Sequence, residues 1–144
     1  MYLKSIFENN KNIPSEYSCD GEGLRPPLEI YDVPPQTASL ALIVLDPDAP
    51  SGNFCHWTIW NIDPKTTKID SNNIPDGSIE GLTSLGKPGY VSPCPPSGIH
   101  RYIITLYALN SKLELDSNIN YQQLQNEINI HLIEKVKLTG LYSR

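Results

Sequence analysis

Three polar clusters lie at the ends of apolar segments, and their side chains could together bind an anion. In chain order the residues are Asp46, Asp48, His56, His100, Arg101 and Tyr102. Histidines supply N–H donors, and the backbone amides of a Pro/Gly-rich loop such as SPCPPSG, residues 92–98, can point at an anion. A neighbouring carboxylate fixes the tautomer of a histidine and raises its pKa. The clusters therefore predict a small polar pocket.

Each cluster also has a purely structural interpretation. Asp-Pro pairs such as Asp46-Pro47 are common in turns, and a buried histidine is usually a hydrogen-bonded part of a core. Ser97, His100 and Asp46 offer the residue types of a hydrolase triad, but the chain has no GxSxG motif. The usual His and Cys spacings of a metal site are also absent. We therefore expect no enzyme activity, no metal and no cofactor.

The apolar runs that position these clusters are typical of β-strands. Residues 40–45 are continuously aliphatic, and residues 101–109 are β-branched and aromatic. Residues 55–62 alternate, which places Cys55, Trp57, Ile59 and Asn61 on one face and His56, Thr58, Trp60 and Ile62 on the other. Weaker strand signals cover residues 2–7 and 28–32. Trp57, Trp60 and Tyr107 are expected in the core.

One helix is predicted late in the chain. Asn120 and Gln123 have the spacing of a capping box, and apolar residues then recur at helical intervals from Tyr121 to Val136. The helix is expected to end near Leu138, before Gly140. Short strands, frequent Pro/Gly turns and one late helix predict an all-β fold, an antiparallel β-sandwich of two sheets with a C-terminal helix.

The overall composition limits the classes of function. The 144 residues fit a single domain, 1–144, and the net charge of −5 gives no general attraction for nucleic acid or anionic membranes. The first residues do not resemble a signal peptide, and no apolar run is long enough for a membrane span. Cys19, Cys55 and Cys94 form an odd set without a CxxC motif, so reduced thiols and a cytoplasmic location are expected, although one pair could form a disulfide.

The motifs together identify a family. DPDAP at residues 46–50, the H-W and N-I of the following strand, and CPPSGIHRY at residues 94–102 resemble the phosphatidylethanolamine-binding protein family, also called the Raf kinase inhibitor-like family. The stretches IPSEYSCDG and KLTGLYSR are similar to its bacterial and archaeal branch, and the resemblance covers nearly the whole chain. It implies a β-sandwich with a pocket that accepts phosphate, acetate, cacodylate or phosphoethanolamine head groups.

The resemblance also implies roles for individual residues. The implied ligand-binding residues are Asp46, His56, Cys94 through its backbone N–H, Pro95, His100 and Tyr102. Asp48, Pro50 and Arg101 are expected to brace the pocket, with an ion pair between Asp48 and Arg101. Departures from the branch pattern lie outside these residues: Gly23 and Arg25 precede PPL, and Val91-Ser92 replaces a glycine pair.

These observations favour a non-enzymatic binding or regulatory protein whose partner is a small anionic or phosphorylated ligand. An alternative is a serine protease inhibitor that acts through surface loops, because some family members inhibit proteases. Residues 74–98 offer such loops, with Leu82, Leu85 and Tyr90 as apolar contacts. The resemblance also implies a homodimer.

Overall fold

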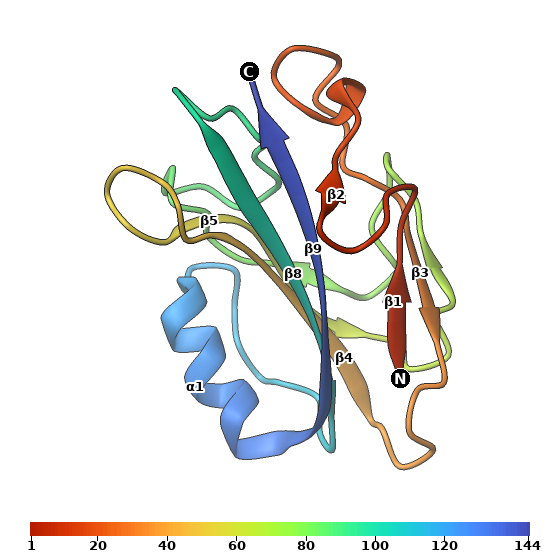
Figure 1. Cartoon of the computed structure of the whole chain (residues 1–144). Coiled ribbons are helices and arrows are strands. Elements are labelled where there is room, and N and C mark those ends of the chain that lie inside the picture. The colour runs from red at the N-terminus through yellow and green to blue at the C-terminus, as the bar shows by residue number, and fades with distance from the viewer.

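Two β-sheets pack against each other in the computed structural model, which describes residues 1–144 (Figure 1). A three-stranded sheet has the order β1-β3-β6, and a six-stranded sheet has the order β2-β9-β8-β4-β5-β7. The strands are β1 (Tyr2–Lys4), β2 (Lys11–Asn12), β3 (Leu28–Tyr31), β4 (Ser39–Asp46), β5 (Phe54–Ile62), β6 (Lys68–Ile69), β7 (Ile79–Glu80), β8 (Ile99–Leu109) and β9 (Leu132–Ser143). A 3-10 turn, η1 (Ser15–Tyr17), and one α-helix, α1 (Tyr121–His131), complete the elements.

The strand pairing corrects one part of the predicted fold. All pairs are antiparallel except β2 with β9, which are parallel, so the six-stranded sheet is mixed. Gly140 of β9 permits this pairing, because a Cβ there would lie 2.5 Å from Ile13 Cγ1 and 2.8 Å from Phe7 Cε2. The fold is therefore mostly β with two sheets, as expected, but it is not wholly antiparallel.

The helix is shorter than predicted and is not the last element. Asn120 and Gln123 form the predicted capping box, but α1 ends at His131 and residues 132–143 form β9. The apolar spacing led to too long a helix. Leu132 and Val136 are four residues apart, which fits both one turn of a helix and two repeats of a strand. Pairing of β9 along nearly the whole of β8 then decides for a strand.

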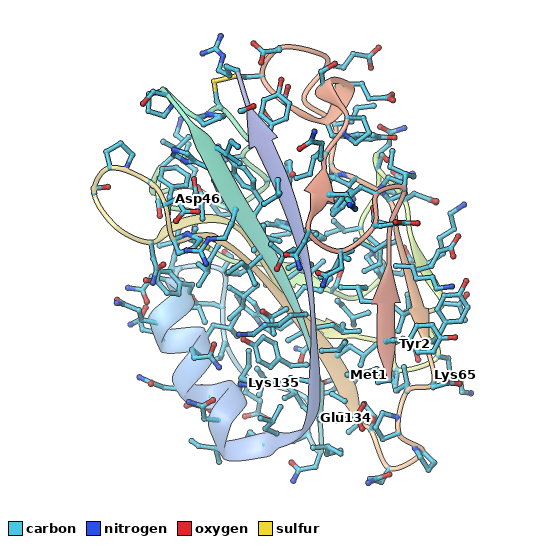
Figure 2. All side chains as sticks on the ribbon, viewed as in Figure 1. Met1, Tyr2, Asp46, Lys65, Glu134 and Lys135 are labelled. Atoms are coloured by element: carbon cyan, nitrogen blue, oxygen red, sulfur yellow. A yellow bond between two sulfur atoms is a disulfide. The ribbon has the colours of Figure 1, made fainter.

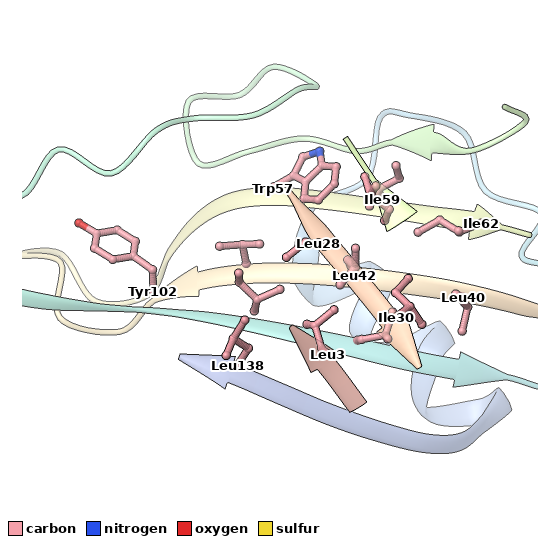
Figure 3. Packing of buried hydrophobic residues seen from close by; sticks show 14 of the residues in the cluster. Leu3, Leu28, Ile30, Leu40, Leu42, Trp57, Ile59, Ile62, Tyr102 and Leu138 are labelled. Atoms are coloured by element: carbon pink, nitrogen blue, oxygen red, sulfur yellow. The ribbon is translucent and has the colours of Figure 1, made fainter. Parts of the chain in front are cut away.

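The core lies between the sheets, and a second apolar cluster lies on the other face of the six-stranded sheet. The larger cluster includes Leu42, Trp57 and Ile59 (Figure 3). The smaller one contains Trp60 and Tyr107 and is covered by α1. Trp57, Trp60 and Tyr107 are buried, which confirms the prediction for all three. Burial of apolar side chains on both faces explains why β4 reads as an unbroken aliphatic run.

The predicted alternation of β5 breaks near Ile62, at one of the two register shifts between β4 and β5. Ile62 was expected on the face of Trp60, but it packs in the larger cluster with Trp57. Asn61 has a φ of 56°, a left-handed conformation, and the β4–β5 register shifts at this point. The Asn61 side chain binds both backbone polar groups of Leu113, at 2.8 Å each, which stabilises the unusual backbone.

Candidate functional site

The three predicted polar clusters meet at one end of the six-stranded sheet. Strand β4 pairs antiparallel with β5 on one side and with β8 on the other, so its C-terminal end lies beside the N-terminal ends of both. Asp46 ends β4, His56 stands near the start of β5 and His100 near the start of β8. The antiparallel topology therefore brings together residues that are up to 54 positions apart.

A pocket of about 160 Å³ lies at this point. Its lining residues are Asp46, Ala49, Pro50, Phe54, His56, Val91, Ser92, Cys94, Pro95, Pro96, His100 and Tyr102. This set contains all six residues predicted to bind a ligand, and Pro50, which was predicted to brace the pocket. The lining combines polar side chains with prolines and apolar side chains, a composition found in small-molecule sites.

Asp46 fixes the orientation of His100. The Nδ1 atom of His100 lies 2.7 Å from Asp46 Oδ2, and both side chains are buried. The other carboxylate oxygen of Asp46 accepts the backbone N–H of Asp48 at 2.8 Å. Both oxygens of Asp46 accept hydrogen bonds, so His100 carries its proton on Nδ1. The Nε2 atom is then the ring nitrogen that is left for a ligand.

A backbone carbonyl fixes the orientation of His56. Nδ1 of His56 donates to the carbonyl of Val91 at 2.7 Å, and the N–H of Val91 donates back to the carbonyl of His56 at 2.9 Å. Burial lowers the pKa of His56, and the Val91 carbonyl and the nearby Asp46 only partly oppose this effect. No protein group hydrogen-bonds Nε2 of either His56 or His100, so each ring has one nitrogen available to a ligand.

Aromatic rings enclose the two imidazoles. Tyr102 lies edge-on to His56 at 5.1 Å between centroids and is stacked near His100 at 6.5 Å. The centroid of the Phe54 ring lies 4.8 Å from that of the His56 ring. Burial raises the pKa of Tyr102, so its hydroxyl remains protonated and can act as a hydrogen-bond donor. These contacts limit the rotation of both imidazoles.

Comparison with known proteins identifies the family. The profile of the phosphatidylethanolamine-binding protein family matches residues 4–143. The chain belongs to the phosphatidylethanolamine-binding protein family. A UPF0098 protein of Methanothermobacter thermautotrophicus is 44% identical over 100% of this chain and 99% of its own length.

Solved structures of family members are also similar. A putative phosphatidylethanolamine-binding protein homologue from Chlamydia trachomatis is 36% identical, with a TM-score of 0.94 over 99% of this chain and 96% of that one. Escherichia coli YbcL, described as a member of the mammalian family, is 28% identical, with a TM-score of 0.89 over 99% of this chain and 97% of its own. The fold described above is therefore the fold of the family.

Asp48 and Arg101 form the predicted ion pair outside the pocket lining. Arg101 donates from Nε to Asp48 Oδ2 and from Nη2 to Oδ1, each at 2.9 Å, and its backbone N–H also donates to Oδ2. These bonds join the loop after β4 to the start of β8. They hold the pKa of Asp48 down at about 2, mainly through the Arg101 side-chain bonds.

We predict that this pair stabilises the fold only above strongly acidic pH. The folded-state pKa of Asp48 lies below its ordinary value of 3.8, so its contribution is present above about pH 4 and disappears as the pH falls towards 2. The free energies of unfolding of the wild type and Asp48→Asn should therefore differ at neutral pH and converge near pH 2. Urea titrations across this range provide the measurement. A difference that stays constant down to the lowest pH would contradict the assignment.

The cysteines depart from the expected reduced state. Cys94 of the pocket loop forms a disulfide with Cys19, which follows η1, and Cys55 is free. The Cys19 N–H also donates to the carbonyl of Pro93 at 3.0 Å, so two links hold the N-terminal segment against the pocket loop. An odd number of cysteines shows only that at least one is unpaired. It does not show which two form the disulfide, and here the two partners are 75 residues apart in sequence. Figure 2 shows the bond between the two sulfur atoms near the C-terminus.

Several pocket residues carried no clear sequence signal. Val91 acts through its carbonyl, which no residue type reveals, although the Val91-Ser92 pair had been noted as a departure from the branch pattern. Phe54 could have been found, because it precedes His56 by two residues and therefore shares its face of the strand. Arg25, another departure, is buried over the Trp57 ring at 4.6 Å and donates to two backbone carbonyls, so it supports the fold rather than the pocket.

The alternative chemistries receive no support from the geometry. No hydrogen bond joins Ser97 to His100, although the His–Asp half of a triad is present. Burial raises the pKa of the Cys55 thiol to about 11, so the thiol stays protonated, and the backbone N–H and carbonyl of Cys55 both bind Ser84. No group of three or more His, Cys, Asp or Glu side chains is placed to hold a metal ion. Neither helix has the length and apolar character needed to cross a membrane.

Proposed function

We propose that the chain is a non-enzymatic binding or regulatory protein that holds a small phosphorylated ligand, such as a phosphoethanolamine head group, between His56 and His100. The observation that carries this proposal is the pair of oriented imidazoles in a mostly apolar pocket. In each ring Nδ1 is occupied by Val91 or Asp46 and Nε2 has no protein partner. Both rings line one preformed pocket and are held by hydrogen bonds, so little conformational entropy is lost when a ligand binds.

The size of the pocket supports a head group rather than a lipid tail. A pocket of about 160 Å³ has room for several water molecules, hence for a phosphate and a short carbon chain. Pro50, Pro95 and Pro96 line it, so its mouth has a restricted backbone. Family membership agrees with ligand binding, since the family takes its name from a phospholipid with this head group.

The direct test is calorimetric titration with O-phosphoethanolamine. His56→Ala removes one of the two imidazoles, and we expect it to weaken binding by about tenfold to a hundredfold, the usual effect of losing a hydrogen bond to a charged group. The matched control is His131→Ala, which removes the third histidine, at the end of α1, where it contacts Asn110. Equal binding by the wild type and His56→Ala would contradict the proposal.

One surface loop favours protease inhibition as a second candidate function. Leu85 is 64% exposed on a tight loop, whereas Tyr90 packs against Trp57 in the core. Thr83 accepts hydrogen bonds from the N–H of both Leu85 and Gly86, and its own N–H binds the carbonyl of Lys87. A rigid loop that presents one apolar side chain has the form that a protease pocket can engage.

Inhibition would show as a one-to-one endpoint in a titration of a chymotrypsin-like serine protease. We predict that Leu85→Glu would abolish that endpoint, because a carboxylate is not accepted by an apolar specificity pocket. Leu132→Glu, at an exposed leucine on β9, is the matched control and should inhibit like the wild type. A flat titration with the wild type would exclude this second function for the protease used.

The homodimer and the cytoplasmic location remain predictions. Analytical ultracentrifugation tests the first against the 16.1 kDa mass of one chain. The Cys19–Cys94 disulfide argues against a cytoplasmic location, because disulfides persist mainly in oxidising compartments.

A further inference from the structure

The two pocket histidines present hydrogen-bond acceptors to the ligand when both rings are neutral. The carbonyl of Val91 can only accept, so Nδ1 of His56 must carry the proton and Nε2 is left with a lone pair. The Asp46 carboxylate imposes the same tautomer on His100. A fully ionised oxyanion also offers acceptors only. A hydrogen bond between either Nε2 and such an anion therefore requires a proton from elsewhere.

We propose that the pocket selects a phosphomonoester that carries one proton, or equivalently the dianion together with one protonated histidine, and that binding at neutral pH takes up this proton from solvent. This inference rests on the proposed function and names the form of the ligand that the site accepts. In the complex the proton lies between a phosphate oxygen and Nε2, and no bond to phosphorus forms or breaks. A sulfate ester, which carries no proton, lacks this donor.

The charges around the pocket favour the protonated form. Asp46 is buried against His100 and repels a second negative charge on the ligand. Desolvation lowers the pKa of His56, so this ring is uncharged at neutral pH before a ligand binds. The Tyr102 hydroxyl stays neutral, because burial raises its pKa.

The remaining charges near the pocket do not replace the missing donor. The Asp48 carboxylate and the Arg101 guanidinium neutralise each other. The Arg144 guanidinium is held by Asp20 and lies 3.7 Å from Cys94 Sγ, outside the pocket lining. The buried Cys55 thiol is uncharged, because burial raises its pKa. The proton must therefore come with the ligand or from solvent.

The experiment compares O-phosphoethanolamine with ethanolamine O-sulfate by calorimetry on the full chain. The second pKa of a phosphomonoester is about 6. Below it both ligands carry the same charge on their ester groups, and only the phosphate carries a proton. We expect the sulfate ester to bind about tenfold or more weakly there, since the site loses a charge-assisted hydrogen bond.

Proton uptake is measured by repeating the phosphoethanolamine titration in buffers with different ionisation enthalpies. Above the second pKa of about 6, we expect uptake of close to one proton and an affinity that falls by about tenfold per pH unit. Below this pKa the uptake should vanish. The affinity for the sulfate ester should rise as the pH falls. This ester carries no proton, so the proton between it and Nε2 must come from a protonated histidine.

His56→Gln provides an independent test, because an amide N–H donates without taking up a proton. We expect this variant to take up fewer protons when it binds the phosphate ester. Its affinities for the sulfate and phosphate esters should also differ less than those of the wild type. His131→Gln is the control and should behave like the wild type. Equal affinity of the wild type for the two esters, with no dependence of the heat on the buffer, would overturn the inference and leave the proposed function intact. Failure of both esters to bind at any pH would overturn the proposed function itself.

Discussion

Asp46→Ala is expected to lower the free energy of unfolding by about 2–4 kcal/mol, because it leaves the buried His100 ring and the partly buried backbone N–H of Asp48 without an acceptor. Asp46 is only 3% exposed, and its two oxygens accept hydrogen bonds from the His100 ring and from the backbone N–H of Asp48. Without the carboxylate, the His100 ring also loses its fixed orientation. Binding of O-phosphoethanolamine should therefore weaken in the same variant.

Urea unfolding of the wild type and Asp46→Ala measures this effect, and Asp63→Ala is the matched control. Asp63 accepts a backbone N–H two residues later, from Lys65, just as Asp46 does from Asp48, but it lies on the surface and binds no histidine. The control should therefore change stability by no more than about 1 kcal/mol. Asp46→Asn keeps the shape of the side chain, so its free energy of unfolding should lie between those of the wild type and Asp46→Ala. Equal stability of Asp46→Ala and the wild type would show that the His100–Asp46 bond contributes nothing.

The double variant Cys19→Ala, Cys94→Ala is expected to lose about 2–4 kcal/mol of stability, because the disulfide closes a long loop and restricts the unfolded chain. The two cysteines are 75 residues apart, so the restriction is large. The bond also ties the segment after η1 to the pocket loop. Binding of O-phosphoethanolamine should weaken too, because Cys94 and Pro95 line the pocket and would gain conformational freedom.

A dithiol reductant tests the same bond without a substitution. It should destabilise the wild type by a similar amount and leave the double variant unchanged, because the remaining Cys55 has no partner. The comparison separates loss of the disulfide from loss of side-chain packing. A reductant that destabilises both proteins equally, or neither, would show that the Cys19–Cys94 bond does not stabilise the fold.

The local features of the chain were predictable from its sequence. Continuous and alternating apolar patterns located β4, β5 and β8, and the Asn120–Gln123 spacing located the start of α1. Two antiparallel connections between these strands suffice to bring Asp46, His56 and His100 to one end of a sheet. The ion pair of Asp48 and Arg101 was expected from the family resemblance and is present.

Other features depend on contacts between distant segments, which a pattern of residue types does not contain. Residues 132–143 fit the helical period and the strand period alike, and only pairing along β8 makes them β9. The parallel pairing of β2 depends on Gly140, whose missing Cβ leaves room for Ile13 and Phe7. Nothing local distinguished Cys19 from Cys55 as the partner of Cys94.

The chemistry of the pocket also has one part that the sequence predicts and another that depends on contacts between distant segments. Sequence alone singled out the two histidines and the acid as candidates, because these residue types at strand ends can bind a small anion. Tertiary structure decided which nitrogen of each ring remains available, because the backbone carbonyl of Val91 and the carboxylate of Asp46 occupy Nδ1 in both. A hydrogen bond from a side chain to a distant backbone carbonyl depends on how the chain folds, so the tautomers of His56 and His100 become known only once the strands are paired.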